Sequence, residues 1–147
     1  MHDVRLTESG FSPADELDVF ARAHDGSGAI ASFTGQVRPG GGVLALELTH
    51  YAPLTLPGME KIAQDAQNRF TLEGLLALHR VGKMLPGEPI VMVAAAAAHR
   101  RDAIQAVDFM MDHLKSAAWF WKREQRNDGW HWISPRSADH ADLARWN

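Results

Sequence analysis

Two lysines near the end of the chain have the residue type and spacing to do chemistry. Lys115 and Lys122 are seven residues apart, so a helix continuing through both would put them on one face, two turns apart. If the helix ends near Ala118, Lys122 lies on the following strand and the turn can still bring it near Lys115. Residues 119–122 read Trp-Phe-Trp-Lys, and desolvation among such rings favours a neutral amine that can act as acid, base or nucleophile. The alternative is a lysine whose stem packs on the rings while its ammonium reaches water.

Other basic residues are concentrated at two junctions between expected elements. His99, Arg100 and Arg101 stand where an apolar strand passes into a helix, and the backbone N–H groups of a helix start favour an anion. Arg38 precedes the loop 39–42 (Pro-Gly-Gly-Gly), which could close over a ligand while the guanidinium binds a phosphate with two hydrogen bonds. A solvated helix start and a plain hairpin turn explain the same residues without a ligand.

The composition excludes several kinds of chemistry. The chain has no cysteine, so it forms no disulfide, thiolate metal site, iron–sulfur cluster or cysteine nucleophile, and any reacting sulfur must arrive on another molecule. The eight histidines are scattered without metal-ligand spacing, so we expect no metal. A formal charge of -3 argues against nucleic-acid binding.

The chain shows no signal-peptide pattern and no membrane-spanning segment. Its longest apolar run, residues 90–98, is far shorter than the roughly 20 residues needed to cross a bilayer. We therefore expect a soluble cytoplasmic protein. The length of 147 residues predicts a single domain, 1–147, in which 134–147 is a polar tail on the surface or on a partner.

The element pattern predicts an α+β fold. Ser12-Pro13 predicts the start of one helix, Pro57-Gly58 of a second and His99 of a third. Strands are expected at 29–37, 43–51, 75–81, 90–97, 119–124 and 130–133. The strand at 43–51 is expected to return beside 29–37, and the last two strands to form a hairpin that turns at residues 127–129. Because strands and helices do not alternate singly, we expect a mostly antiparallel sheet with three main helices.

Two apolar patterns remain in the C-terminal half. The third helix is expected to bury one stripe formed by Ile104, Val107, Met111, Leu114 and Ala118. All five tryptophans lie at or after residue 119. They form either the core of a hairpin or a partner-binding surface, where tryptophan is enriched.

Four segments, standing in a fixed order, carry a resemblance to a known family. They are residues 28–38 (GAIASFTGQVR), 79–83 (HRVGK) with the following Pro-Gly-Glu turn, 97–100 (AAHR), and 111–115 (MDHLK) with 120–124 (FWKRE). The Phe-Thr-Gly-x-Val-Arg stretch and the Leu-Lys…Phe-Trp-Lys spacing are together specific. From Gly28 to about Ile133 the sequence resembles the large, catalytic subunit of molybdopterin synthase.

The resemblance implies a concrete activity and assembly. The family converts cyclic pyranopterin monophosphate into molybdopterin by installing a dithiolene, without a cofactor of its own. The sulfur comes from a small ubiquitin-like subunit whose C-terminal Gly-Gly thiocarboxylate enters a pocket of the large subunit. Two large subunits form a central homodimer with a small subunit at each end, giving a heterotetramer, and the family fold is an α/β-hammerhead.

The resemblance also implies roles for individual residues. Lys115 would lie beside the incoming tail and the reacting carbon, with Lys122 assisting. The two lysines would hold the thiocarboxylate and transfer protons as sulfur adds and the cyclic phosphate opens. The other matching positions contact the substrate: Arg38, His99 and Arg100 for phosphate and pterin, Phe33 and Met111 for an apolar wall, and Arg136 from a C-terminal basic region. In a dimer some of these residues would serve the neighbouring subunit's site.

The sequence departs from the family pattern at three places. Residues 52–56 resemble a short insertion before Pro-Gly-Met, Gln36 stands where lysine is common, and 116–119 lack the usual arginine and proline. None of these changes touches the two lysines, so they affect loop contacts more than the reaction.

Two other functions fit parts of the pattern. One is a non-catalytic module of the same fold that docks a ubiquitin-like, Gly-Gly-tailed protein through its tryptophan-rich end. The other is an unrelated enzyme of phosphorylated metabolites, which would bind its ligand without a protein partner.

Overall fold

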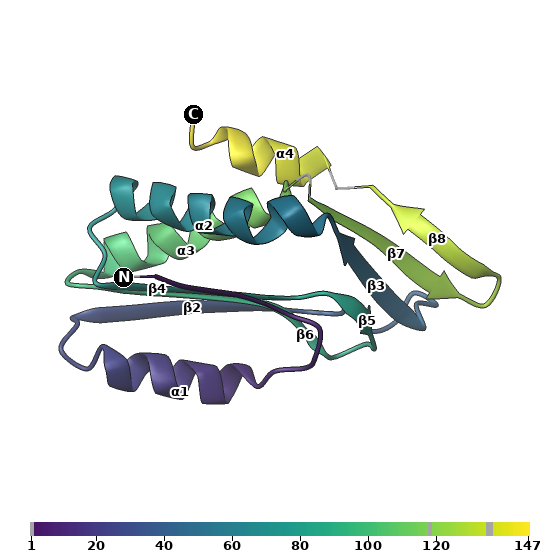
Figure 1. Cartoon of the computed structure of the whole chain (residues 1–147), viewed down its shortest axis with the longest axis horizontal. Helices are drawn as coiled ribbons and strands as arrows, with labels where there is room; N and C mark the ends of the chain where they lie inside the picture. The colour runs from purple at the N-terminus through teal and green to yellow at the C-terminus, as the bar shows by residue number, and fades with distance from the viewer. Residues whose placement is uncertain (1, 118, 135–136) are drawn as a thin grey trace.

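Two four-stranded sheets and the helices around them build the fold (Figure 1). The structure is a computed structural model that describes residues 2–117, 119–134 and 137–147. In chain order the elements are β1 (His2–Thr7), α1 (Pro13–Ala23), β2 (Ala29–Gln36), β3 (Ala45–His50), α2 (Ala52–Arg69), β4 (Gly74–Arg80), β5 (Gly82–Met84), β6 (Pro89–Ala97), α3 (Arg100–Lys115), β7 (Phe120–Arg126), β8 (Gly129–Ile133) and α4 (Ser137–Ala144).

The first sheet has the order β1-β4-β6-β2 and lies between helices (Figure 1). Its β1–β4 pair is parallel and its other pairs are antiparallel. Along β6, Val91, Val93 and Ala95 face the core shared with α2 and α3, whereas Met92 and Ala94 face the α1 side. Because both faces of β6 are covered, its sequence is a continuous apolar run rather than an alternating one.

The second sheet has the order β5-β3-β7-β8 and is entirely antiparallel. The chain passes into it directly from β4, through Val81 and Gly82. Gly82 has φ +94°, a conformation that side-chain-bearing residues rarely adopt. Leu46, Leu48 and Met84 form a small core with Val81 on this sheet, so the change of sheet brings the end of β4 beside β3 and β7.

The expected fold class is confirmed, together with the three main helices and the C-terminal hairpin. Ser12 caps α1 as predicted, because its hydroxyl accepts a hydrogen bond from the Asp15 backbone N–H at 3.3 Å. Two short strands, β1 and β5, were not predicted. β1 is an edge strand with polar residues at alternate positions, and β5 has only three residues, so neither leaves a strong apolar pattern.

Two expectations about neighbouring elements were wrong. The strands at 29–37 and 43–51 do not pair with each other, since β2 pairs with β6 and β3 pairs with β5 and β7. The second helix begins at Ala52, not at Pro57, which lies inside it. Two hydrogen bonds to the Tyr51 carbonyl stabilise its first turn: the carbonyl accepts one from the Thr55 N–H at 3.1 Å and one from the Thr55 hydroxyl at 2.8 Å.

Helix α3 buries a different stripe from the one expected. Val107, Met111 and Leu114 are buried as predicted, but Ile104 is 57% exposed, and Ala118 lies outside the described residues. Fully buried Ala103, Ala106 and Met110 complete the inner face. Small alanines here let α3 lie close to the alanine-rich sheet.

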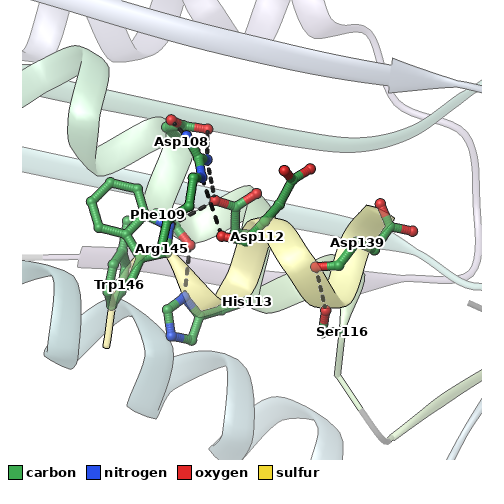
Figure 2. A network of polar contacts seen from close by, with 9 residues as sticks. Asp108, Phe109, Asp112, His113, Ser116, Asp139, Arg145 and Trp146 are labelled. Carbon is green, nitrogen blue, oxygen red and sulfur yellow. Dashed lines mark hydrogen bonds and ion pairs between the residues drawn. The ribbon is translucent and has the colours of Figure 1, made fainter. Parts of the chain in front are cut away.

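The C-terminal segment is a helix packed on α3, where a polar tail was expected (Figure 2). Asp112 accepts hydrogen bonds from the Arg145 guanidinium at 2.5 Å and the Trp146 indole N–H at 2.7 Å. The Trp146 ring also contacts Phe70 and Phe109 edge-on, with centroids 6.0 and 5.4 Å apart. These contacts fix α4 over the end of α3 that carries Lys115.

The tryptophans divide between the two expected roles. Trp119 and Trp146 pack against the core, whereas Trp121 and Trp132 are 50% and 66% exposed on the hairpin. Among the described residues, no helix has both the length and the apolar character needed to cross a membrane.

Candidate active site

Lys115 and Lys122 line the same pocket, which lies where the two sheets meet under α4. The pocket is about 100 Å³ in volume, and its wall is mostly apolar. The lining residues come from β3, β4, β6, α3, β7, β8, α4 and the segment between α3 and β7: Leu46, Leu48, His79, Ile90, Leu114, Lys115, Ala117, Phe120, Lys122, Ile133 and Asp139. Small-molecule sites usually measure roughly 300–1,000 Å³, so this pocket suits a slender group better than a whole bicyclic ligand.

The two lysines reach the pocket from different elements. Lys115 is the last residue of α3, where the partial negative charge of the helix C-terminus stabilises an ammonium. Lys122 lies on β7 opposite Leu48 of β3. Lys115 is exposed and Lys122 half-buried. The turn between α3 and β7 therefore brings the lysines together, as expected if the helix ends before Lys122.

A buried histidine, His79 at the end of β4, forms another part of the wall. It is 7% exposed, and its ring stacks on Phe120 with centroids 4.2 Å apart and planes inclined by 20°. Burial lowers the pKa of His79 to about 4, a hydrogen bond to the Arg80 carbonyl opposes that shift, and the positive charge of Lys115 adds to it. The ring is therefore neutral near pH 7.

The backbone around the pocket is held by close packing. The Tyr51 N–H donates to the Trp119 carbonyl at 3.0 Å, and the Trp119 ring covers Gly58 of α2. A Cβ at position 58 would lie 2.1 Å from the ring, so only glycine allows this approach. Phe120, which stacks on His79, follows Trp119 directly and so depends on this packing.

Helix α4 supplies a carboxylate to the pocket. Asp139 is the one acidic residue among the lining side chains of the described chain. Its backbone carbonyl accepts a hydrogen bond from the Ser116 hydroxyl at 3.3 Å (Figure 2). A carboxylate in the same pocket as two lysines offsets part of their positive charge, so an anionic ligand entering the pocket competes with Asp139.

The other predicted site residues that the structure describes lie outside this pocket in a single chain. His99 stands at the N-cap position of α3 without a side-chain capping hydrogen bond, and Arg100 is the first residue of the helix, so both lie more than about 20 Å along the helix from Lys115. Arg38 is exposed after β2, and Phe33 is 43% exposed on that edge strand. Met111 is buried in the main core, and Arg136 lies outside the described residues.

Sequence reasoning missed His79 and Asp139 as pocket residues. His79 had one visible signal, a single histidine that directly follows the apolar run of the strand GLLALHR. Asp139 had none, because its position depends on the packing of α4. No group of three His, Asp or Glu side chains in the described chain could hold a metal ion.

A larger hollow of about 500 Å³ lies between β1 and α1, away from these lysines. Its charged residues, Arg5 and Glu16, are paired with each other at 2.6 Å. The pair raises the pKa of Arg5 and lowers the pKa of Glu16. Because its charges already neutralise each other, this hollow is a weaker candidate for anion chemistry than the lysine pocket.

Comparison with known proteins identifies the family. The sequence model of the MoaE protein family matches residues 6–117. The chain belongs to the MoaE family. A molybdopterin synthase catalytic subunit from Caulobacter vibrioides is 44% identical over 98% of this chain and 97% of its own.

Solved MoaE-family structures agree with the fold. The molybdopterin biosynthesis MoaE protein from Burkholderia ambifaria MC40-6 has a TM-score of 0.84 and 42% identity, covering 99% of this chain and 98% of its own. A complex of subunits 1 and 2 of molybdopterin-converting factor from Helicobacter pylori 26695 gives a TM-score of 0.79, with coverage of 91% and 92%. At 19% identity, the latter likeness shows the fold alone.

Proposed function

We propose that this chain is the catalytic subunit of a molybdopterin synthase, a sulfurtransferase of molybdenum cofactor biosynthesis. The observation that carries the proposal is the meeting of Lys115 and Lys122 in one narrow pocket. The MoaE membership and the Caulobacter relative support the same activity. The substrate is cyclic pyranopterin monophosphate, and the product carries a dithiolene.

The sulfur donor in this proposal is the C-terminal thiocarboxylate of a small ubiquitin-like subunit. The chain itself contains no cysteine, so sulfur must come from outside. A Gly-Gly tail has no side chains and is the kind of slender group that a pocket of about 100 Å³ accepts. The apolar wall strengthens the attraction between its anionic end and the lysines.

Within that pocket the lysines have related roles. Lys115 binds the thiocarboxylate beside the reacting carbon and supplies a proton as sulfur adds and the cyclic phosphate opens. Lys122 assists from β7. A mobile tail held in a fixed orientation reacts faster because the encounter becomes effectively intramolecular.

The pterin and its phosphate extend beyond this pocket toward residues supplied by a second copy of the chain. Arg38, His99 and Arg100 would bind the phosphate and pterin, Phe33 would contribute an apolar contact, and Arg136 would add a further positive charge. Met111 is buried in the main core, so it would support this surface without touching the ligand. The exposure of Phe33 on the edge strand β2 supports a homodimer there. With one small subunit at each end, the working assembly is a heterotetramer in the cytoplasm.

Reconstitution tests the activity directly. The chain is mixed with a thiocarboxylated small subunit and the cyclic precursor, and the pterin product is identified by mass. Lys115→Ala should abolish turnover while the fold is retained, because an exposed lysine contributes little packing. Lys61→Ala is the matched control, since Lys61 forms only a surface pair with Asp65. Wild-type turnover in Lys115→Ala would refute the assigned role of Lys115.

A non-catalytic docking module is the second candidate, favoured by the exposed rings of Trp121 and Trp132. Such a module would bind the small subunit and leave the precursor unchanged. If the chain bound no Gly-Gly-tailed protein at all, both functions would be excluded in favour of an enzyme acting alone on a phosphorylated metabolite.

A further inference from the structure

His79 lines the lysine pocket without a part in the chemistry assigned to the lysines. It stands at the end of β4, with its ring between the first sheet and Phe120 of the second. A histidine placed here only for packing would need no particular protonation state. The contacts around His79 nevertheless select one.

The hydrogen bonding of the ring fixes its tautomer. His79 Nδ1 lies 2.9 Å from the Arg80 carbonyl oxygen, and a carbonyl oxygen can only accept, so Nδ1 carries a proton. Burial holds the pKa of His79 at about 4, so the ring is neutral near pH 7 and has only one proton. Nε2 is therefore unprotonated and acts as a hydrogen-bond acceptor.

The polar groups around the ring are mostly cationic or able to donate a hydrogen bond. Lys115 of α3 and Lys122 of β7 share the pocket with it, and Asp139 of α4 is the acidic group there. His50 at the end of β3 also acts on the ring. The neighbouring residues on β1 and β6 that pair with position 79, Leu6 and Val91, carry no charge.

His50 uses its Nδ1 for a hydrogen bond with Thr55. The Thr55 hydroxyl donates its proton to the Tyr51 carbonyl, so the 2.9 Å contact between Thr55 and His50 Nδ1 requires that nitrogen to be the donor. Within the pocket wall, Lys115 is thus the donor whose charge acts most strongly on the His79 ring.

We propose that His79 is a positioning residue of the lysine pocket: its fixed, neutral imidazole offers Nε2 as an acceptor to the Lys115 ammonium and so aims that ammonium at an incoming anion. The ring suits this role because stacking on Phe120 and the bond to the Arg80 carbonyl prevent it from rotating. A neutral acceptor orients the ammonium without cancelling its charge, which a carboxylate at this position would do. The catalytic part of this inference rests on the function proposed above.

Titration of Lys115 by NMR tests the contact in the isolated chain. Lysine is labelled with ¹³C, and the Lys115 signal is assigned by its loss in Lys115→Arg. In His79→Phe, which keeps a ring on Phe120 but has no acceptor, the Lys115 titration midpoint should fall by about one unit, because the charged form loses a hydrogen bond. His79→Gln restores an acceptor and should bring the midpoint back toward the wild-type value.

His113 provides the matched control. Its Nδ1 also bonds to a backbone carbonyl, that of Phe109, at 2.8 Å, and its ring also lies on a phenylalanine. It is only two residues from Lys115 but does not line the lysine pocket. His113→Phe should therefore leave the Lys115 midpoint unchanged. An unchanged midpoint in folded His79→Phe, or equal shifts in both variants, would overturn the proposal.

A reciprocal measurement does not depend on the folding of His79 variants. In the ¹⁵N spectrum of the wild-type imidazoles, His79 should show a protonated Nδ1 and an unprotonated Nε2 at pH 7. The Nε2 resonance should move in Lys115→Ala and stay in place in Lys61→Ala. A protonated Nε2, or a resonance insensitive to Lys115, would contradict the proposal.

Turnover then connects the contact to catalysis. With the small subunit and precursor, His79→Phe should lose roughly tenfold to a hundredfold in kcat, with His79→Gln in between. Wild-type kcat in His79→Phe would refute the positioning role. Because the titrations require neither partner nor substrate, absence of turnover in the wild type would count against the proposed function and leave the Lys115–His79 contact to be judged separately.

Discussion

Acid should destabilise this protein specifically through His79. In the unfolded chain the ring titrates near its ordinary value of 6.5, and in the folded chain its pKa is about 4. Above pH 6.5 both states carry a neutral ring, so this group adds no pH dependence. Between 6.5 and 4 the unfolded chain binds a proton that the folded chain excludes, so the free energy of unfolding falls as pH falls. From pH 7 to pH 5 the expected loss is about 2 kcal/mol.

Urea unfolding of the wild type and His79→Phe at pH 7 and pH 5 measures this loss. The variant cannot bind the proton, so its advantage over the wild type should grow by about 2 kcal/mol at the lower pH. Ion pairs such as Arg5–Glu16 are common to both chains and cancel in the difference. If the stability difference were the same at both pH values, His79 would titrate normally in the folded chain and the argument for its burial would fail.

Two substitutions test the packing that supports the pocket. Gly58→Ala should destabilise the fold by about 1–3 kcal/mol in urea unfolding, because the new Cβ would lie 2.1 Å from the Trp119 ring. Gly26→Ala is the control and should lower the stability far less, because a Cβ at position 26 would have nothing within 4 Å. Equal losses of stability in the two variants would refute the close approach of Trp119 to Gly58. Trp146→Ala should lower the free energy of unfolding by about 3 kcal/mol, because it removes core contacts and an indole hydrogen-bond donor. Trp132, which is exposed, is the control. A larger loss of stability in Trp132→Ala than in Trp146→Ala would contradict the docking of α4.

Much of the fold followed from local pattern. The Ser12 cap, the apolar run of β6 and the turn at residues 127–129 each specify a nearby structure through short-range chemistry. The division of the strands between two sheets did not follow from local pattern. A hairpin between β2 and β3 is the simplest connection, but glycines 40–42 all have positive φ, and the loop they form lets the chain leave one sheet for the other.

The candidate site was partly predictable for the same reason. Lys115 and Lys122 are close in sequence, so a turn between them could be foreseen. His79 and Asp139 join them only through contacts across long stretches of chain, the stacking on Phe120 and the packing of α4 on α3. Such contacts depend on how elements pack in three dimensions, which periodicity does not encode.

The positions of the tryptophans give the molecule a built-in optical reporter. All five indoles belong to the hairpin region or the C-terminal segment, and none is in β1, β2, β4 or β6. Intrinsic fluorescence is therefore weighted toward the end of the protein that contains the lysine pocket, and only Trp119 and Trp146, which pack on the core shared with α2 and α3, are known to report on the helix-covered sheet. Circular dichroism, which registers every helix and strand, would complement it. A comparison of the two signals during unfolding would reveal whether the pocket end loosens before the rest.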